Sequence, residues 1–299
     1  MKFNIVYGNH GTNPVGVEGI ITYVKACVES AGHRTSLSPI PVMDKINILI
    51  DGFCDPFEDI VLNRLQPRPP LILVATENVS PEGYWPGATA PFIEKQARFT
   101  CLRRISRSVE AVWCMLPQQV DQYKYTFGIE NVFCLPHGYV DGYYGFDYID
   151  ECDRDIDFFF SGSMTEYRQS IMDRLSSARF NCVSLDPGVS NFIRNEAISR
   201  SKICLALRQE PNWPSPSISR IHHHLMAQSF VSSEKCEDDS VLDPYIEVVE
   251  PDYLHEICIE TIVRGGTAGM GALNHQRFRR ETDVTQAVAA ILEASAGGF

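Results

Sequence analysis

The chain has 299 residues, of which 44% are hydrophobic and 21% charged, and its formal net charge is −12. This composition is typical of a folded globular protein large enough for two domains of ordinary size. The acidic balance argues against bulk affinity for nucleic acid or for an anionic bilayer, although it says nothing about a local basic pocket.

Ten cysteines are spread over the chain, no two of them form C-x-x-C, and most lie in apolar runs such as "KICLAL". This pattern predicts buried free thiols in a reducing compartment rather than a disulfide framework. The N-terminus has no signal-peptide pattern, and no apolar run reaches the ~20 residues that span a bilayer. We therefore expect a cytoplasmic protein.

The first half of the chain alternates apolar runs with helical patterns. A strand is predicted at "KFNIVYG" and a helix at "VEGIITYVKACVESAGH", which ends at Gly32. The runs "INILIDGF", "PLILVATE", "EAVWCML" and "NVFCLPHGYV" show little alternation, which indicates strands buried on both faces of a parallel sheet.

The alternation of apolar runs and helical patterns stops at residues 141–154, which are rich in aromatic residues, Gly and Asp and have no clear period. After this predicted linker come strands at "IDFFFSG", "FNCVSL", "KICLAL", "SFVSSE" and "YIEVVE", with helices from about Glu166, Phe192 and Ser217. A final helix is predicted at "ETDVTQAVAAILEASAGG". The fold class is therefore α/β, with two doubly wound parallel sheets.

The strand "IDFFFSG" passes into its helix through Ser161, Gly162 and Ser163, and Arg168 lies near the start of that helix. Ligands of open α/β sheets bind at the carboxyl ends of strands, where a turn without bulky side chains exposes backbone N–H groups to a phosphate. The sequence therefore predicts an anion site here, and the alternative is that Gly162 only permits a tight turn.

A second candidate lies in "NWPSPSISRIHHHLMAQSFVSSE". Ser217 or Ser215 suits an N-cap, which puts Ser219 and Arg220 in the first turn of the helix. A hydroxyl, free N–H groups and a guanidinium suit a diphosphate, although the pattern also fits an ordinary capped helix.

Three consecutive histidines, 222–224, invite a metal interpretation. Consecutive helical side chains point about 100° apart, so three in a row do not converge on one ion. We expect one useful histidine, His224, which shares a helix face with Arg220.

In the first half, "GNHGTNPVGVEG" follows the first strand but matches neither G-x-G-x-x-G nor the P-loop pattern. His10 lies in this loop, and an unperturbed histidine pKa of ~6.5 suits a general base. Glu77 follows "LILVAT" and precedes an aromatic loop with Tyr84 and Trp85, so it is a second candidate base.

Taken together, the glycine-rich first loop, "CLPHGYVDGYY", "DIDFFFSGSMTEYRQSIMDRL" and "ISRSKICLALRQE…SISRIHHHLMAQSFVSSE" resemble the GT-B glycosyltransferases, most closely family 4-like or CgeB-like bacterial members. The resemblance implies two Rossmann-like domains facing a central cleft. Residues 1–140 would hold the acceptor and 155–280 a UDP- or GDP-linked sugar. Residues 281–299 would form a C-terminal helix that packs back on the first domain. It implies no metal and no other cofactor.

The same resemblance implies contacts between the donor and residues at the two candidate turns. These residues are Gly162, Ser163, Arg168, Arg208, Ser217, Ser219, Arg220 and His224. The sequence departs from the E-x7-E pattern of retaining members, because Pro216 and His224 stand at the two glutamate positions. The departure puts a retaining reaction in doubt and leaves His10 or Glu77 as the base of an inverting one.

Other functions remain open from the sequence. One is a GT-B-shaped sugar-nucleotide epimerase or phosphorylase, for which Lys202 is a poor pyridoxal phosphate lysine. Another is a catalytically degenerate binding or regulatory protein, which the missing glutamate pair permits. Neither the sugar, the acceptor nor the oligomeric state follows from the sequence, and peripheral membrane contact stays open.

Overall fold

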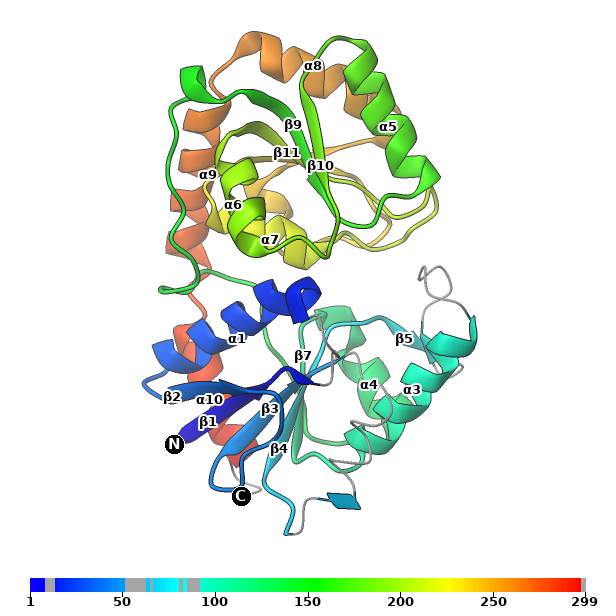
Figure 1. The fold of residues 1–299 in the computed structure, drawn as a ribbon, viewed down its shortest axis with the longest axis vertical. Helices are drawn as coiled ribbons and strands as arrows, with labels where there is room; N and C mark the ends of the chain where they lie inside the picture. The colour runs from blue at the N-terminus through cyan, green and yellow to red at the C-terminus, as the bar shows by residue number, and fades with distance from the viewer. Residues whose placement is uncertain (9–13, 52–62, 65–66, 81–82, 85–91, 297–299) are drawn as a thin grey trace. The chain divides into compact units, whose positions relative to one another are not determined.

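The computed structural model describes residues 1–8, 14–51, 63–64, 67–80, 83–84 and 92–296 (Figure 1). The chain divides into two compact units. Unit 1 comprises Met1–Pro136 and Val284–Phe299, and unit 2 comprises His137–Asp283.

Unit 1 is built on a six-stranded sheet in which every neighbouring pair is parallel, with the order β2-β1-β3-β4-β7-β8. The strands are β1 (Lys2–Val6), β2 (Arg34–Ser38), β3 (Ile46–Ile50), β4 (Leu71–Ala75), β7 (Ala111–Cys114) and β8 (Val132–Cys134). All residues of β3 and β4 are buried, as their continuous apolar runs predict for strands covered on both faces. A short antiparallel pair, β5 (Val79–Ser80) and β6 (Gly83–Tyr84), follows β4.

The helices of unit 1 within the described residues are α1 (Glu18–Ser30), α3 (Phe92–Ser106), α4 (Val120–Phe127) and α10 (Thr285–Ala296). Although α10 follows unit 2 in the sequence, it packs beside α1. The indole Nε1 of Trp113 in β7 donates a hydrogen bond to the Ser295 hydroxyl of α10 at 2.9 Å, and both side chains are buried. This bond ties the last helix to the first sheet.

Unit 2 contains a five-stranded parallel sheet in the order β10-β9-β11-β12-β13. Its strands are β9 (Ile156–Ser161), β10 (Cys182–Leu185), β11 (Ser201–Ala206), β12 (Phe230–Glu234) and β13 (Glu247–Val249). The two parallel sheets confirm the predicted α/β class.

Five helices accompany the sheet of unit 2: α5 (Glu166–Ser177), α6 (Asn191–Ser199), α7 (Ile218–Met226), α8 (Leu254–Arg264) and α9 (Thr267–Glu281). Figure 1 shows these helices around the sheet. The packing of the three phenylalanines of β9 tells which helices cover which face. Phe158 and Phe160 pack into a cluster with α5 and α8, whereas Phe159 packs with α6 on the opposite face. The alternation of side chains along a strand therefore requires an apolar residue at all three positions.

The segment predicted as a linker, 141–154, belongs to unit 2. One of its aromatic residues anchors the segment to α7, because the Tyr143 hydroxyl forms a hydrogen bond with His223 Nδ1 at 2.8 Å. Arg154 donates through Nη1 to the Ser201 carbonyl at 2.9 Å. The two units separate instead at residues 136/137 and 283/284, where the sequence shows no change in composition.

Within the described part of the chain, the cysteines are free thiols, as predicted. None of the described helices is long and apolar enough to cross a membrane.

We predict that Ser295→Ala lowers the free energy of unfolding by about 1–3 kcal/mol, because the buried indole N–H of Trp113 loses its acceptor. Urea unfolding followed by circular dichroism measures this change. Ser177→Ala is the control, since that exposed serine bonds only within its own helix, to the Arg174 carbonyl. Equal stability of both variants would show that the bond to α10 contributes nothing.

Candidate functional site

The turn after β9 requires a glycine at position 162. Gly162 has a φ of +149°, and a Cβ there would lie 2.5 Å from Nη2 of Arg220. Glycine alone adopts this backbone readily and leaves room for the guanidinium. Helix α5 begins just beyond, where the Thr165 hydroxyl caps it by accepting from the Arg168 backbone N–H at 3.3 Å.

Arg220, in the first turn of α7, reaches this turn. Its Nε donates to the Ser161 carbonyl at 2.6 Å, and its Cζ lies 4.8 Å from the centre of the Phe160 ring. Burial lowers the pKa of Arg220 to about 9, and the charges of Arg168 and Arg194 act in the same direction. A guanidinium whose surroundings oppose its charge is stabilised by a nearby anion.

Arg168 is buried and joins two loops at the carboxyl edge of the sheet. It donates to the carbonyls of Arg208, Ser163 and Leu207, at 2.9, 2.7 and 3.1 Å. Burial lowers its pKa to about 10. The sequence predicted a phosphate contact for Arg168, whereas these bonds give it a role in holding the loops after β9 and β11 together.

Ser219 and Ser217 also lie at the start of α7. Ser217 is the N-cap residue by position, although its side chain makes no capping bond. Ser219 is exposed, and its hydroxyl lies 3.2 Å from Nε2 of the buried His137. This contact was not predicted, because His137 and Ser219 are 82 residues apart in the sequence and no local pattern connects them.

Arg208 lies in the loop after β11, beside Glu234 at the end of β12. The Arg208 backbone N–H donates to Glu234 Oε2 at 2.6 Å, and the Tyr167 hydroxyl donates to Oε1. Nε of Arg208 lies 3.9 Å from that oxygen. Burial raises the pKa of Glu234. Glu234 and Tyr167 were not predicted, and they fix the place of the predicted Arg208.

The predicted residues at the carboxyl edge of unit 2 therefore form two groups. Gly162 and Arg220 meet at the turn after β9, with Ser219 beside Arg220 in the first turn of α7, and Arg168 and Arg208 support the loop after β11. Burial lowers the pKa of both Arg168 and Arg220, the charges of Arg168 and Arg194 lower the pKa of Arg220 further, and Glu234 opposes the shift at Arg168. This edge can bind an oxyanion with two or more negative charges.

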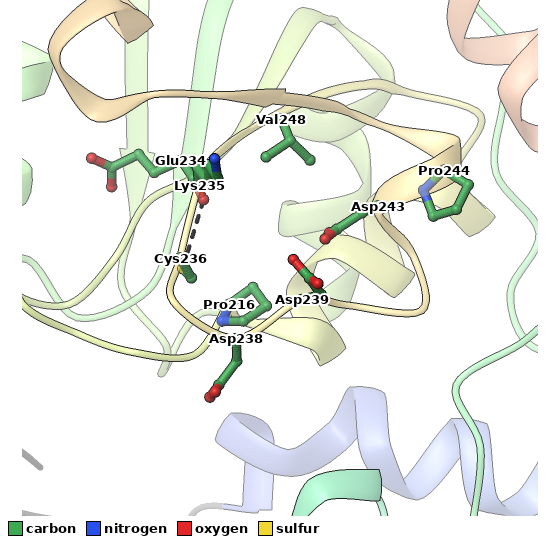
Figure 2. Close-up of a pocket in the computed structure, with 9 residues that line it drawn as sticks. All are labelled: Pro216, Glu234, Lys235, Cys236, Asp238, Asp239, Asp243, Pro244 and Val248. Carbon is green, nitrogen blue, oxygen red and sulfur yellow. Dashed lines mark hydrogen bonds between the residues drawn. The ribbon is translucent and has the colours of Figure 1, made fainter.

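A pocket of about 320 Å³ adjoins this region (Figure 2). Nine residues line it: Pro216, Glu234, Lys235, Cys236, Asp238, Asp239, Asp243, Pro244 and Val248. Burial raises the pKa of Asp243, and the nearby Asp239 adds to the effect. The acidic lining disfavours a phosphate in the pocket itself.

The three histidines of α7 have separate environments. His222 donates from Nε2 to the Gly138 carbonyl at 2.9 Å, and His223 bonds through its two nitrogens to Tyr143 and Asn195, each at 2.8 Å. In the described part of the chain, no group of three or more His, Cys, Asp or Glu residues is placed to hold a metal ion.

His224 is the predicted donor contact that the structure does not bring to the site. Its ring is fully buried beside Phe159, with ring centres 6.0 Å apart, and neither nitrogen has a hydrogen-bond partner among the described residues. Burial and nearby positive charges keep its pKa well below the usual range, so the ring is neutral. The ring lies one turn beyond Arg220 on α7 and packs against Phe159 in the interior of unit 2.

Of the two candidate bases in unit 1, His10 lies outside the described residues, as does Trp85. Glu77 follows β4, and its carboxylate lies 3.7 Å from Nη2 of Arg98 with 45% of the side chain exposed. The Tyr123 hydroxyl donates to the Glu77 backbone carbonyl at 3.0 Å, which fixes this residue at the end of the strand.

We predict that His224→Leu raises the free energy of unfolding by about 1 kcal/mol or more, because it removes two buried polar atoms that lack partners. His222→Leu is the matched control on the same helix and should destabilise, since it removes the buried hydrogen bond from His222 to the Gly138 carbonyl. Thermal unfolding and nucleoside diphosphate titration check both points. Loss of nucleotide binding in a folded His224→Leu protein would show that His224 contacts the ligand, as the sequence predicted.

No family model and no curated protein matches the chain. Among solved structures, the chain is similar to AviGT4, a glycosyltransferase involved in avilamycin A biosynthesis, with a TM-score of 0.54 and 11% identity over 99% of this chain and 97% of AviGT4. It is also similar to TarM, with a TM-score of 0.50 and 10% identity over 84% of this chain, which spans only 54% of TarM. At such identities the likeness shows the fold alone. The chain therefore has the GT-B fold that its sequence predicts.

Proposed function

We propose that the protein is a glycosyltransferase that moves a sugar from a nucleotide diphosphate sugar to an acceptor, and that unit 2 binds the diphosphate. The observation that carries the proposal is the packing of Arg220 into the space left by Gly162. It puts a guanidinium, with the exposed Ser219 hydroxyl next to it in the chain, at the carboxyl edge of a parallel sheet. The whole-length similarity to AviGT4, itself a glycosyltransferase, supports the same class of reaction.

The chemistry follows from the leaving group. When the bond between the sugar carbon and the phosphate oxygen breaks, negative charge accumulates on the nucleoside diphosphate. Arg220, the N-terminus of α7 and the Ser219 hydroxyl would stabilise that charge as it develops. Arg168 would keep the two loops in register, because its three carbonyl contacts span them.

The donor would be UDP- or GDP-linked, and the resemblance assigns its binding to unit 2 and the acceptor to unit 1. The proposal assigns neutralisation of the diphosphate to guanidinium groups and requires no metal ion. For an inverting reaction the base would be His10 or Glu77.

We predict that Arg220→Ala weakens binding of UDP or GDP by about 10- to 150-fold, since a charge-assisted contact contributes roughly 1.5–3 kcal/mol. Isothermal titration calorimetry measures the affinity. Arg220→Lys keeps the positive charge but lacks the paired N–H donors of the guanidinium, so it should lose less affinity than Arg220→Ala. Arg174→Ala, an exposed arginine on α5, is the control. Affinities equal to wild type in both Arg220 variants would refute the diphosphate site.

We also predict that either His10→Ala or Glu77→Gln slows turnover by roughly 10²–10⁴-fold while nucleoside diphosphate affinity is kept, because a base acts on the attacking hydroxyl and not on the leaving group. The assay is release of UDP or GDP from sugar nucleotides by the purified protein, with water as acceptor. Asp121→Asn is the control, because its side chain is 96% exposed. Near-normal turnover in both variants would instead favour a retaining path through the donor's own phosphate.

A further inference from the structure

A buried histidine lies directly behind the exposed hydroxyl of the proposed diphosphate site. His137 is only 4% exposed, whereas Ser219 is exposed, and 3.2 Å separates His137 Nε2 from Ser219 Oγ. Both residues belong to unit 2. A ligand at this edge would therefore reach Ser219 and not His137.

The backbone just after His137 is bonded to α7 and to the residue that follows α9. The next residue, Gly138, accepts a hydrogen bond from His222 Nε2 of α7 at 2.9 Å. The N–H of Tyr139 donates at 2.9 Å to the carbonyl of Thr282, just beyond α9. The His137 ring packs edge-on against that of His222, with ring centres 5.5 Å apart. These contacts hold the imidazole in one place relative to the first turn of α7.

The chemistry of the pair depends on which group donates. A serine hydroxyl has one hydrogen and two acceptor lone pairs. If His137 Nε2 carries the proton and donates to Ser219 Oγ, the serine hydrogen is free to point outward. Ionised phosphate oxygens only accept hydrogen bonds, so a hydroxyl that binds them must donate.

We infer that His137 is a positioning residue that donates from Nε2 to Ser219 and thereby directs the serine hydroxyl hydrogen toward the donor diphosphate. The inference rests on the proposed function, because it needs a phosphate group at Ser219. It gives His137 an effect on nucleoside diphosphate affinity that passes through Ser219 alone.

A double-mutant cycle tests this inference, with UDP and GDP titrated by calorimetry into the full-length protein. His137→Leu and Ser219→Ala should each weaken binding about tenfold, and the double variant should be no weaker than Ser219→Ala alone. Losses that multiply to about a hundredfold, or unchanged affinity in a folded His137→Leu protein, would overturn the inference. Ser170→Ala, on the exposed face of α5, is the control for a serine substitution.

Two polar variants test the hydrogen bond that His137 donates to Ser219, even if His137→Leu does not fold. The amide nitrogen of glutamine reaches about as far as Nε2, whereas that of asparagine stops near the position of Nδ1. His137→Gln should bind within about twofold of wild type, and His137→Asn should show the tenfold loss. Equal affinities of these two variants would contradict the inference. A wild-type protein that binds neither UDP nor GDP would overturn the proposed function and this inference together.

Discussion

The packing of one guanidinium against one glycine organises the carboxyl edge of unit 2. Arg220 donates to the Ser161 carbonyl and lies over Phe160, and this arrangement exists because Gly162 has no side chain to occupy the same space. The bond links the strand end of β9 to the first turn of α7. Because it draws a cation into partly buried surroundings near Arg168, the free protein holds positive charge that an anion would stabilise.

The supporting residues come from far along the chain and hold this edge rigid. Arg168 binds carbonyls on two loops, Glu234 accepts from the Arg208 backbone, and His137 lies behind Ser219. Most of these bonds join a side chain to a fixed backbone group. If the proposed function holds, a site built in this way loses little conformational entropy when a diphosphate binds.

Local patterns predicted the parts of the structure that depend on neighbours in the sequence. The triple phenylalanine strand, the glycine turn and the first turn of α7 followed from burial, backbone freedom and capping. His224 follows Arg220 by four residues, which correctly put the two side chains on one face of the helix. That face points inward, however, and the His224 ring packs against Phe159. No element was predicted for α8 and α9, where the polar residues and glycines of α9 obscure the helical period. His137 and Glu234 gained their roles only through contacts across 82 and 26 residues.

A crystal structure of the protein soaked with UDP or GDP tests the central claim most directly. The account predicts phosphate oxygens within hydrogen-bond distance of Ser219 Oγ and the Arg220 guanidinium, beside the Gly162 turn. Phosphates bound in unit 1, or in the acidic pocket beyond β12 with Arg220 and Ser219 untouched, would contradict it.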